Sequence, residues 1–378
     1  MGKRELVLIA AFLVVGVVVY QATAPPAPPG SDVSVGGIFQ QIRRHMQGAR
    51  ETAEGSSQQT VAVGHDVETV RLLVSRPSEL IVTGSDRNDI SIETRATARG
   101  YTQAEARAAA DAIAVKAETQ SGAIVLTGAW DDHRGSSGYL TQVSITILVP
   151  RRLGIRIDPH LGGLTVSNVA SLECKSSRGE TRVVDTAGSV QLTHANGTLE
   201  VRGGTSLKLS ARNSRGEVSG LSGTTSIDAT GARLKLSALT GALEIESRNS
   251  DLTIENITGL TSPLRYNGTG GELRITDLRT EARIDGRNTD VAVMLGAAAP
   301  VTIYNVGDID VTAPPGGYTL DAVANDGKIT TGDSSITATP SEGPDARVSA
   351  KIRGGGPTMT LRATRGRIDV RAPAGAGK

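Results

Sequence analysis

The chain has 378 residues, of which 38% are apolar and only 2% aromatic, so its core must be built from aliphatic side chains. Its 45 glycines exceed the usual share in globular proteins, which favours many tight turns and argues against a helical protein. The formal net charge of +1 gives no sign of a nucleic-acid-binding chain, and the lone Cys174 excludes an internal disulfide.

Residues 1–24 have the character of an export segment. Lys3 and Arg4 precede an uncharged apolar run over residues 6–20, and Ala22 and Ala24 form a small-x-small cleavage pattern. The segment is therefore either an uncleaved signal anchor, with residues 6–24 in the cytoplasmic membrane, or a signal peptide whose cleavage releases a secreted protein. In both cases we expect the body of the chain outside the cytoplasm, in the periplasm or at the cell surface.

Residues 25–59 are rich in Pro, Gly, Ser and Gln and are predicted to be a spacer. Within them, Ile38, Phe39, Ile42 and Met46 recur at helical spacing beside several arginines. This pattern fits a short basic amphipathic helix on the membrane surface, or a linker with incidental apolar residues.

Residues 60–150 are predicted to hold N-terminal strands and one helical insert. Alternating segments begin at Thr60. An Ala-rich stretch over residues 102–119 begins with Thr102, and Glu105 follows three residues later. This spacing matches a capping box and predicts a helix with a small apolar face. Such a helix can lie closely over strands, so we interpret it as a lateral or capping element for the sheet that follows.

Residues 151–371 are predicted to form one domain, in which residues 164–331 repeat about every 18 to 20 residues, with two short alternating strands in each period, separated by Gly and Asn. The first strand series includes 190–192, 207–209, 226–228, 243–245, 264–266, 283–285, 301–303 and 320–322. The second includes 199–201, 217–219, 234–236, 252–254, 273–275, 291–293, 309–311 and 329–331. This rhythm predicts an all-β chain built as a right- or left-handed β-solenoid, in which each coil buries its apolar face by stacking on its neighbours. We expect a last coil over residues 346–370 to close the stack, and residues 372–378 to form a disordered tail.

Several segments together resemble a known family. They are Leu80-Ile-Val-Thr-Gly-Ser-Asp86, Ile90-Ser-Ile-Glu93, the helical insert, Ile145-Thr-Ile-Leu-Val-Pro150, Ile155-Arg-Ile157 and Gly163-Leu-Thr-Val166, followed by the repeats. In this order, over residues 60–370, the chain resembles the putative-adhesin family of bacterial cell-envelope β-strand-repeat proteins, whose members are largely of unknown function. The resemblance implies an extracytoplasmic β-solenoid and carries over no catalytic residues.

Two columns of side chains recur at fixed places in the repeat. Asn occupies the corner before the second strand at positions 196, 213, 249, 288, 305 and 325. Asn tolerates the left-handed backbone of a sharp corner, and its amide can bond the amide one coil away, so we expect a structural ladder. The second column is acidic, interrupted by Arg233, and is a tentative contact ladder: Glu217, Asp251, Glu272, Asp290 and Asp308. It can act as a solvated acidic edge that deters edge pairing, or as a calcium site.

Few residues suggest catalysis. His45, His65, His133, His160 and His194 do not fall at metal-ligand spacing, so we expect no catalytic, cofactor or metal site. The cluster from Trp130 to Arg134, which contains His133, fits a charged hairpin tip as well as a metal or acid/base site. Cys174 has Lys175 beside it, which can lower a thiol pKa, although a Cys inside a repeat is usually a small core residue.

These observations predict a protein that binds through a face and not through a single pocket. We expect an adhesin-like binding or scaffold protein of the bacterial envelope, with a role in envelope sensing open, that contacts an envelope protein or glycan and no nucleic acid. The alternative is a β-solenoid polysaccharide lyase or hydrolase that uses surface pairs such as Asp277 with Arg279, or Asp285 with Arg287. The scarcity of aromatic residues to support sugar rings favours the non-enzymatic interpretation.

Overall fold

The computed structural model describes residue 15 and residues 48–74, 77–128, 138–257, 259–332 and 345–373. The described residues are almost entirely strands and turns, with one helix, which confirms the predicted all-β class. The chain divides into two compact units. The first comprises Met1–Thr60, Ser91–Lys116 and Thr127–Thr146, and the second comprises Val61–Ile90, Ala117–Leu126 and Ile147–Lys378.

Seven strands and one helix precede the repeats. The strands are β1 (Glu51–Ala62), β2 (Thr69–Val74), β3 (Glu79–Ser85), β4 (Asp89–Gly100), β5 (Val115–Gln120), β6 (Ala123–Gly128) and β7 (Gly138–Pro150), and the helix is α3 (Gln103–Asp111). In the first unit, β4 pairs with both β1 and β7. The start of β1 corrects the predicted spacer, because its last nine residues, 51–59, belong to a strand.

Helix α3 begins where the sequence predicts. The Thr102 hydroxyl accepts a hydrogen bond from the Glu105 backbone N–H at 3.2 Å, and the Glu105 carboxylate accepts one from the Tyr101 N–H at 3.1 Å. The helix ends at Asp111, however, and residues 115–120 of the predicted helix form β5. Val115, the first residue of β5, is buried, so tertiary burial overrides the helix propensity of this stretch.

Three glycines let α3 lie closely over the strands of the first unit. A Cβ at Gly55 in β1 would lie 2.5 Å from Ala110 O, one at Gly100 in β4 would lie 2.5 Å from Ala106 N, and one at Gly138 in β7 would lie 2.5 Å from Glu105 O. Ala106 and Ala110 are buried on the facing side of the helix. Backbone and small side chains therefore make this contact, with no room for larger ones.

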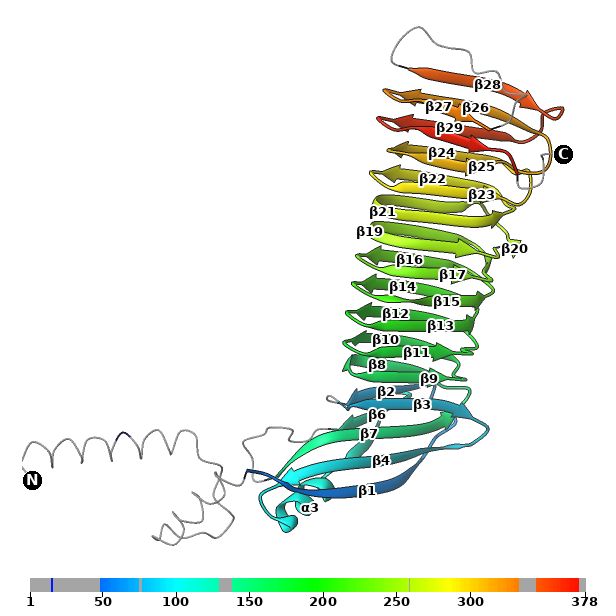
Figure 1. Cartoon of the computed structure of the whole chain (residues 1–378). Helices are drawn as coiled ribbons and strands as arrows, with labels where there is room; N and C mark the ends of the chain where they lie inside the picture. The colour runs from blue at the N-terminus through cyan, green and yellow to red at the C-terminus, as the bar shows by residue number, and fades with distance from the viewer. Residues whose placement is uncertain are drawn as a thin grey trace, which may run out of the picture. The chain divides into compact units, whose positions relative to one another are not determined.

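The strands of the second unit form two walls of parallel neighbours (Figure 1), and below a coil means one strand of the first wall together with the strand of the second wall that follows it in the chain. The first wall contains β8 (Gly154–Leu161), β10 (Ser171–Ser177), β12 (Ser189–Ala195), β14 (Ser206–Arg212), β16 (Thr225–Thr230), β22 (Ala282–Arg287), β24 (Val301–Val306), β26 (Tyr318–Asn325) and β29 (Thr358–Thr364). The second wall contains β9 (Gly163–Ser167), β11 (Glu180–Val184), β13 (Thr198–Gly204), β15 (Arg215–Leu221), β17 (Arg233–Ser237), β23 (Asp290–Leu295), β25 (Ile309–Thr312), β27 (Ile329–Thr331) and β30 (Ile368–Arg371).

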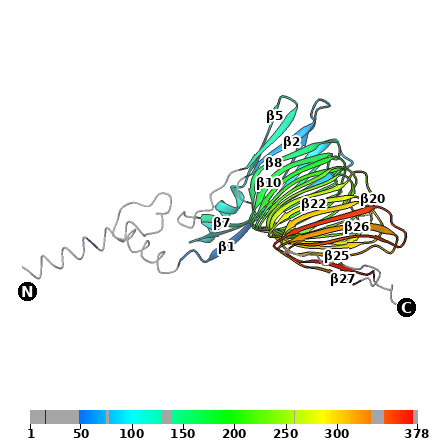
Figure 2. The ribbon, with the colours of Figure 1, turned by 90° about the horizontal axis from the view of Figure 1, so that it is seen from above.

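The remaining strands join or flank these walls. β19 (Leu243–Glu255) and β21 (Leu264–Leu278) are long enough to turn the corner and contribute to both walls, and β28 (Ala346–Ile352) lies beside β26. β18 (Thr240–Gly241) and β20 (Gly259–Leu260) form a small separate pair. Seen from above, successive strands of this unit are turned relative to one another and fan out from β2 to β27 (Figure 2).

Register in the walls converts sequence columns into continuous rows of side chains. Leu172 pairs with Ile155 on one side and with Val190 on the other, and Val190 pairs in turn with Leu207. All four side chains are buried. Burying one such side chain fully contributes about 1.5–3 kcal/mol, so the aliphatic rows between the walls account for the core that the scarce aromatics cannot supply.

At the corners between the walls, several residues adopt the left-handed backbone conformation, with positive φ. Asn196, Asn213, Asn249 and Asn288 have φ between 47° and 57°, and the Asn213 amide donates to Asn196 Oδ1 at 3.3 Å. Two members of the predicted Asn ladder behave differently. Asn305 lies buried inside β24 and donates to the backbone oxygens of Thr289 and Asp308, while Asp326 takes the left-handed position beside Asn325.

The order of the last coils differs from their order in the sequence. β29 pairs in parallel with β24 on one side and with β26 on the other, and β30 likewise pairs with both β25 and β27. The coil of β29 and β30 is thus inserted between two coils that precede it in the chain (Figure 1). The expectation that residues 346–370 close the stack was wrong, because the antiparallel strand β28 covers β26 at that end.

Some predictions fall outside the described residues. The export segment 1–24 lies there except for Val15, as do the spacer up to residue 47, the cluster from Trp130 to Arg134 and the tail after residue 373. Within the described part of the chain, no helix has the length and hydropathy needed to span a membrane.

Candidate functional site

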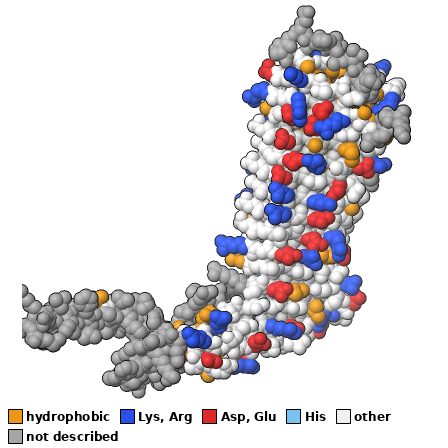
Figure 3. All heavy atoms as spheres, viewed as in Figure 1, with side chains coloured by type: hydrophobic (Ala, Val, Ile, Leu, Met, Phe, Trp, Pro, Cys, Tyr) orange, Lys and Arg blue, Asp and Glu red, His pale blue; other side chains and the backbone are white. Residues whose placement is uncertain are grey.

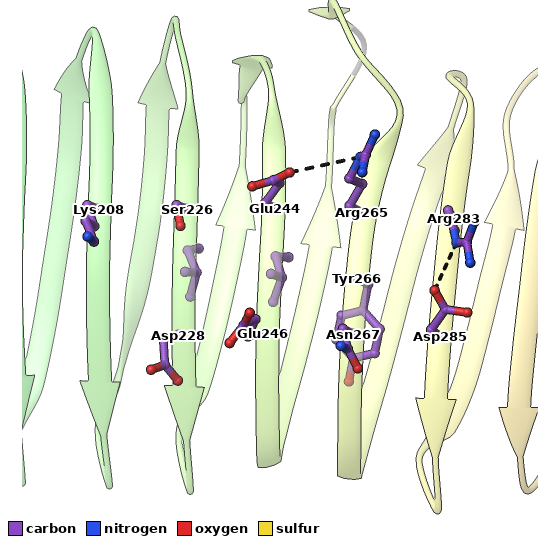
Figure 4. Close-up of a pocket in the computed structure, with 12 residues that line it drawn as sticks. Lys208, Ser226, Asp228, Glu244, Glu246, Arg265, Tyr266, Asn267, Arg283 and Asp285 are labelled. Atoms are coloured by element: carbon purple, nitrogen blue, oxygen red, sulfur yellow. Dashed lines mark hydrogen bonds and ion pairs between the residues drawn. The ribbon is translucent and has the colours of Figure 1, made fainter.

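An open groove crosses the outer face of the first wall, over β14, β16, β19, β21 and β22 (Figure 4). Its volume is about 510 Å³. Strand alternation builds it, because every second residue of these strands points inward to the core and the others point out. Ile227, Ile245 and Tyr266 are inward residues whose strands form the floor of the groove.

Two rows of outward side chains line this groove. The first row follows consecutive register partners across the strands, namely Lys208, Ser226, Glu244, Arg265 and Arg283. The second row lies two residues further along the same strands and consists of Asp228, Glu246, Asn267 and Asp285. Neighbouring positions in a row are about 4.8 Å apart and the two rows about 6.6 Å apart. One row is therefore mainly basic, while the other carries carboxylates and one amide.

Ion pairs satisfy only part of this charge. Arg283 Nε lies 3.0 Å from Asp285 Oδ2, and this hydrogen bond raises the already high pKa of Arg283. Arg265 Nε lies 4.0 Å from Glu244 Oε1. Both pairs are exposed, where such contacts contribute little to stability. Among the described residues no ion pair reaches Lys208, Asp228 or Glu246, so these three groups remain available to a ligand.

Beneath the groove, Tyr266 is almost wholly buried at 2% exposure. Burial raises the pKa of its hydroxyl. A Cβ on Gly268, two residues along the same strand, would lie 2.1 Å from the Tyr266 hydroxyl oxygen. The absence of a side chain at Gly268 thus makes room for the ring, and Tyr266 supports the floor without reaching the ligand side.

The structure brings together most of the predicted acidic ladder and excludes one member. Asp251, Glu272 and Asp290 are consecutive register partners, and Asp308 immediately precedes Ile309, which pairs with Val291. Glu217 instead pairs with Glu200 and Lys235, in a different row. The register partner of Arg233 in that coil is Arg215.

Arginines neutralise much of this acidic column. Arg233 Nη2 lies 2.9 Å from Asp251 Oδ2, Arg274 Nη2 lies 2.6 Å from Glu272 Oε1, and Arg367 Nε lies 3.3 Å from Asp308 Oδ2. No group of three or more His, Cys, Asp or Glu residues in the described chain can hold a metal ion. Charges of both signs also alternate over the face seen in Figure 3. The column is therefore a mixed-charge surface, and its role in contacting a partner stays a prediction.

The charged pairs named for the enzymatic alternative lie apart from one another. Arg279 Nε lies 3.0 Å from Asp277 Oδ1, near the far end of β21. Asp285 pairs with Arg283 and not with Arg287, although all three residues lie on the outward side of β22. Each carboxylate is thus matched locally by an arginine two residues away.

Two of the three described histidines and the cysteine lie in the core, while the third, His65, is exposed. His160 and His194 are fully buried, and burial lowers the pKa of both imidazoles. His194 Nδ1 lies 2.9 Å from Ser176 Oγ, and Thr181 donates to the same Ser176 oxygen. Cys174 is 2% exposed, and burial raises the pKa of its thiol to about 12, as expected for a core residue.

Apart from Asp285, which was named for the enzymatic alternative, the residues that line the groove were absent from the predicted sites. Asp228 and Glu246 occupy the outward positions of the first strand series, and the sequence contained the signal for them in its alternating pattern. The pattern predicts which residues face outward, but every coil has such residues. Only the shape of the surface distinguishes these coils from the others.

The comparisons with known proteins leave the family open. No family model matches the chain, and no curated protein matches it. A solved structure of a putative cell adhesion protein from Clostridium sporogenes shares 10% identity, covers 84% of this chain and 99% of its own, and has a TM-score of 0.19. A putative lipid binding protein from Parabacteroides distasonis shares 10% identity, covers 84% of this chain and 96% of its own, and has a TM-score of 0.28. Similarities this low carry no argument about the activity of this chain.

Proposed function

We propose that the second unit is a β-solenoid of the kind found in the putative-adhesin family, and that the chain is an adhesin-like binding protein of the bacterial envelope. The proposal places the chain outside the cytoplasm, held in the cytoplasmic membrane by residues 6–24 or secreted after cleavage. Its partner is an envelope protein or glycan. Scaffolding and envelope sensing use the same surface, since both need a partner bound along a rigid stack.

The groove on the first wall carries this proposal. Its two rows present Lys208, Asp228 and Glu246 without ion-pair partners, on strands held by the parallel ladder. Rigid positioning of such groups limits the entropy lost on binding. The groove is open and lined by polar groups, which suits an extended molecule that contacts several coils better than a small molecule enclosed in a pocket.

Partner capture tests the proposal. The full chain, in mild detergent and tagged at its C-terminus, is incubated with an envelope extract, and retained proteins and glycans are identified by mass spectrometry. The variant Lys208→Ala/Asp228→Ala/Glu246→Ala should lose the partner. The control Lys175→Ala/Glu180→Ala/Glu281→Ala, which also changes one exposed lysine and two exposed acids without ion pairs, should retain it.

Two results would contradict the proposal. Equal retention by both triple variants would remove the groove from the interface. Release of new reducing ends or unsaturated sugars from envelope polysaccharide by the purified chain would indicate the lyase or hydrolase alternative in place of a binding protein.

A further inference from the structure

Tyr304 is unusual because it is an aromatic side chain held in solvent. It lies in β24, where Val301, Ile303 and Asn305 point inward and are buried, so alternation directs the Tyr304 ring outward. It is 43% exposed, and in the two walls only Met294 is a comparably exposed large apolar side chain among the described residues. A chain with 2% aromatic residues that leaves one of them in water suggests a contact for that ring.

Tyr304 extends the second row of the groove. Its register partner in β22 is Asp285, the last residue of that row, and its partner on the other side is Arg362 in β29. Arg362 is fixed by hydrogen bonds to the Asp321 backbone oxygen and carboxylate. The ring thus stands about 4.8 Å from the groove's end, in line with Asn267 and Asp285.

The chemistry of this row suits a saccharide. A sugar ring offers a face of C–H groups, which packs on an aromatic ring, and an edge of hydroxyls, which donate to carboxylates and exchange hydrogen bonds with an amide. Tyr304 supplies the ring, Asn267 the amide, and Asp228 and Glu246 the carboxylates. A protein partner needs an apolar interface core around such a tyrosine, and the outward neighbours of Tyr304 in its row are charged.

The two free carboxylates of the second row restrict the class of saccharide, because Lys208, the third groove charge without an ion pair, lies in the first row. Asp228 and Glu246 are register neighbours, and as carboxylates without ion-pair partners they accept hydrogen bonds but donate none. A glycan with hydroxyl donors satisfies them, whereas a uronate would add like charge beside two carboxylates. The acidic polysaccharides that the enzymatic alternative would cleave are therefore poor ligands for this row.

We propose that Tyr304 and the second row form a binding site for an extended, hydroxyl-rich glycan without carboxylates, lying along the stack across several coils. The inference rests on the proposed function and assigns its substrate class. It makes Tyr304 the ring-stacking contact and the carboxylates the acceptors for sugar hydroxyls.

The test measures binding of three soluble probes to the full chain by calorimetry: cellohexaose, chitohexaose and a hexamer of galacturonate. At least one of the first two should bind, and the galacturonate hexamer should not. Tyr304→Ala should weaken that binding about tenfold, the loss expected from one stacking contact of about 1.4 kcal/mol. Tyr304→Phe keeps the ring and should bind like the parent. Met294→Ala, on the second wall, removes an equally exposed side chain and should have no effect.

Three results would overturn the inference: no binding of either uncharged probe, preference for galacturonate, or unchanged affinity in Tyr304→Ala. The capture experiment distinguishes this failure from failure of the proposed function. A partner lost by the Lys208/Asp228/Glu246 variant but retained by Tyr304→Ala would keep the binding role and remove the glycan site.

Discussion

At the scale of one residue, His194 should make the stability of the folded chain depend on pH. The imidazole is fully buried beside Ser176 and Thr181, and burial lowers its pKa below the unfolded value of about 6.5. Below pH 6.5 the unfolded chain binds the proton more readily than the folded one. The free energy of unfolding should therefore be highest above pH 6.5 and fall as the pH drops towards the folded pKa.

Urea unfolding at pH 5, 6, 7 and 8 checks this expectation. His194→Asn should reduce the loss of stability between pH 7 and pH 5, leaving the part due to His160, whose pKa burial also lowers. If His194→Asn lost as much stability between pH 7 and pH 5 as the parent, groups other than His194 would cause the pH dependence.

Cys174 should be inert in the folded chain. Its thiol is buried with a pKa of about 12, so almost no thiolate exists at pH 8 and reagents cannot reach the sulfur. We expect no labelling by a disulfide reagent under native conditions and complete labelling in urea. Cys174→Ser/Lys175→Cys moves the thiol to the neighbouring outward position and should label rapidly. Rapid native labelling of the parent would contradict the buried position.

The site residues show where reasoning from the sequence ends. The pattern placed Glu217 with Asp251 because each precedes an apolar residue at the start of a strand. The structure shows that Gly216 occupies the position that an apolar residue, such as Leu199 or Leu234, fills in the neighbouring coils. A Cβ at Gly216 would lie 2.0 Å from Leu199 O, so no larger residue fits there. The glycine shifted the alignment by two residues. Tyr304 is one of the few aromatic residues in the sequence, but only the structure shows that its side chain is exposed.

At the scale of elements, period-two alternation predicted the strand series well because each strand buries one side only. Both strands of each coil appear, from β12 to β27. The same rule missed the beginning of β1, whose residues from Glu51 to Thr60 are mostly polar or small and join a sheet through backbone pairing with β4. It also missed β5, where Ala-rich sequence indicated a helix.

The corners make a testable statement about backbone conformation. Asn288 has a φ of 52° and an exposed side chain, and its N–H donates to Val306 O at 2.7 Å. Asn288→Ala should lower the free energy of unfolding by about 1 kcal/mol. Residues with a Cβ are unfavourable in the left-handed region, and Ala lacks the polar side chain by which Asn and Asp offset this cost. Asn288→Gly, which suits this conformation, should cost less.

Asn325 supplies the control for the corner. It belongs to the predicted Asn ladder, but the left-handed residue in its coil is Asp326. Asn325→Ala should therefore change stability less than Asn288→Ala in matched denaturant titrations. Equal losses at the two positions would mean that backbone conformation does not set the cost.

For the whole molecule, the repeat predicts that coils stack but not which coil contacts which. Each coil presents the same aliphatic rows and the same parallel edges, so coils are nearly interchangeable as neighbours. The connections decide the order. β25 and β26 are joined by residues 313–317, and this link leaves a gap that β29 and β30 fill. Nothing in the residue pattern of 358–371 distinguishes an inserted coil from a terminal one.

The inserted coil predicts how truncation affects the end of the stack. Among the described strands β26 pairs only with β28 and β29, and β27 pairs with β30, so a chain ending at Gly332 lacks each of these sheet partners of that coil. Residues 318–331 should then detach and become sensitive to protease. A chain ending at Ala313 should show the same melting temperature and yield the same protease-resistant fragment. If residues 318–331 stacked directly on β24 and β25, the longer chain would be the more stable and would keep them protected. Both truncated chains expose the edges of β24 and β25, which the full chain covers, so both should also self-associate more readily in sedimentation experiments.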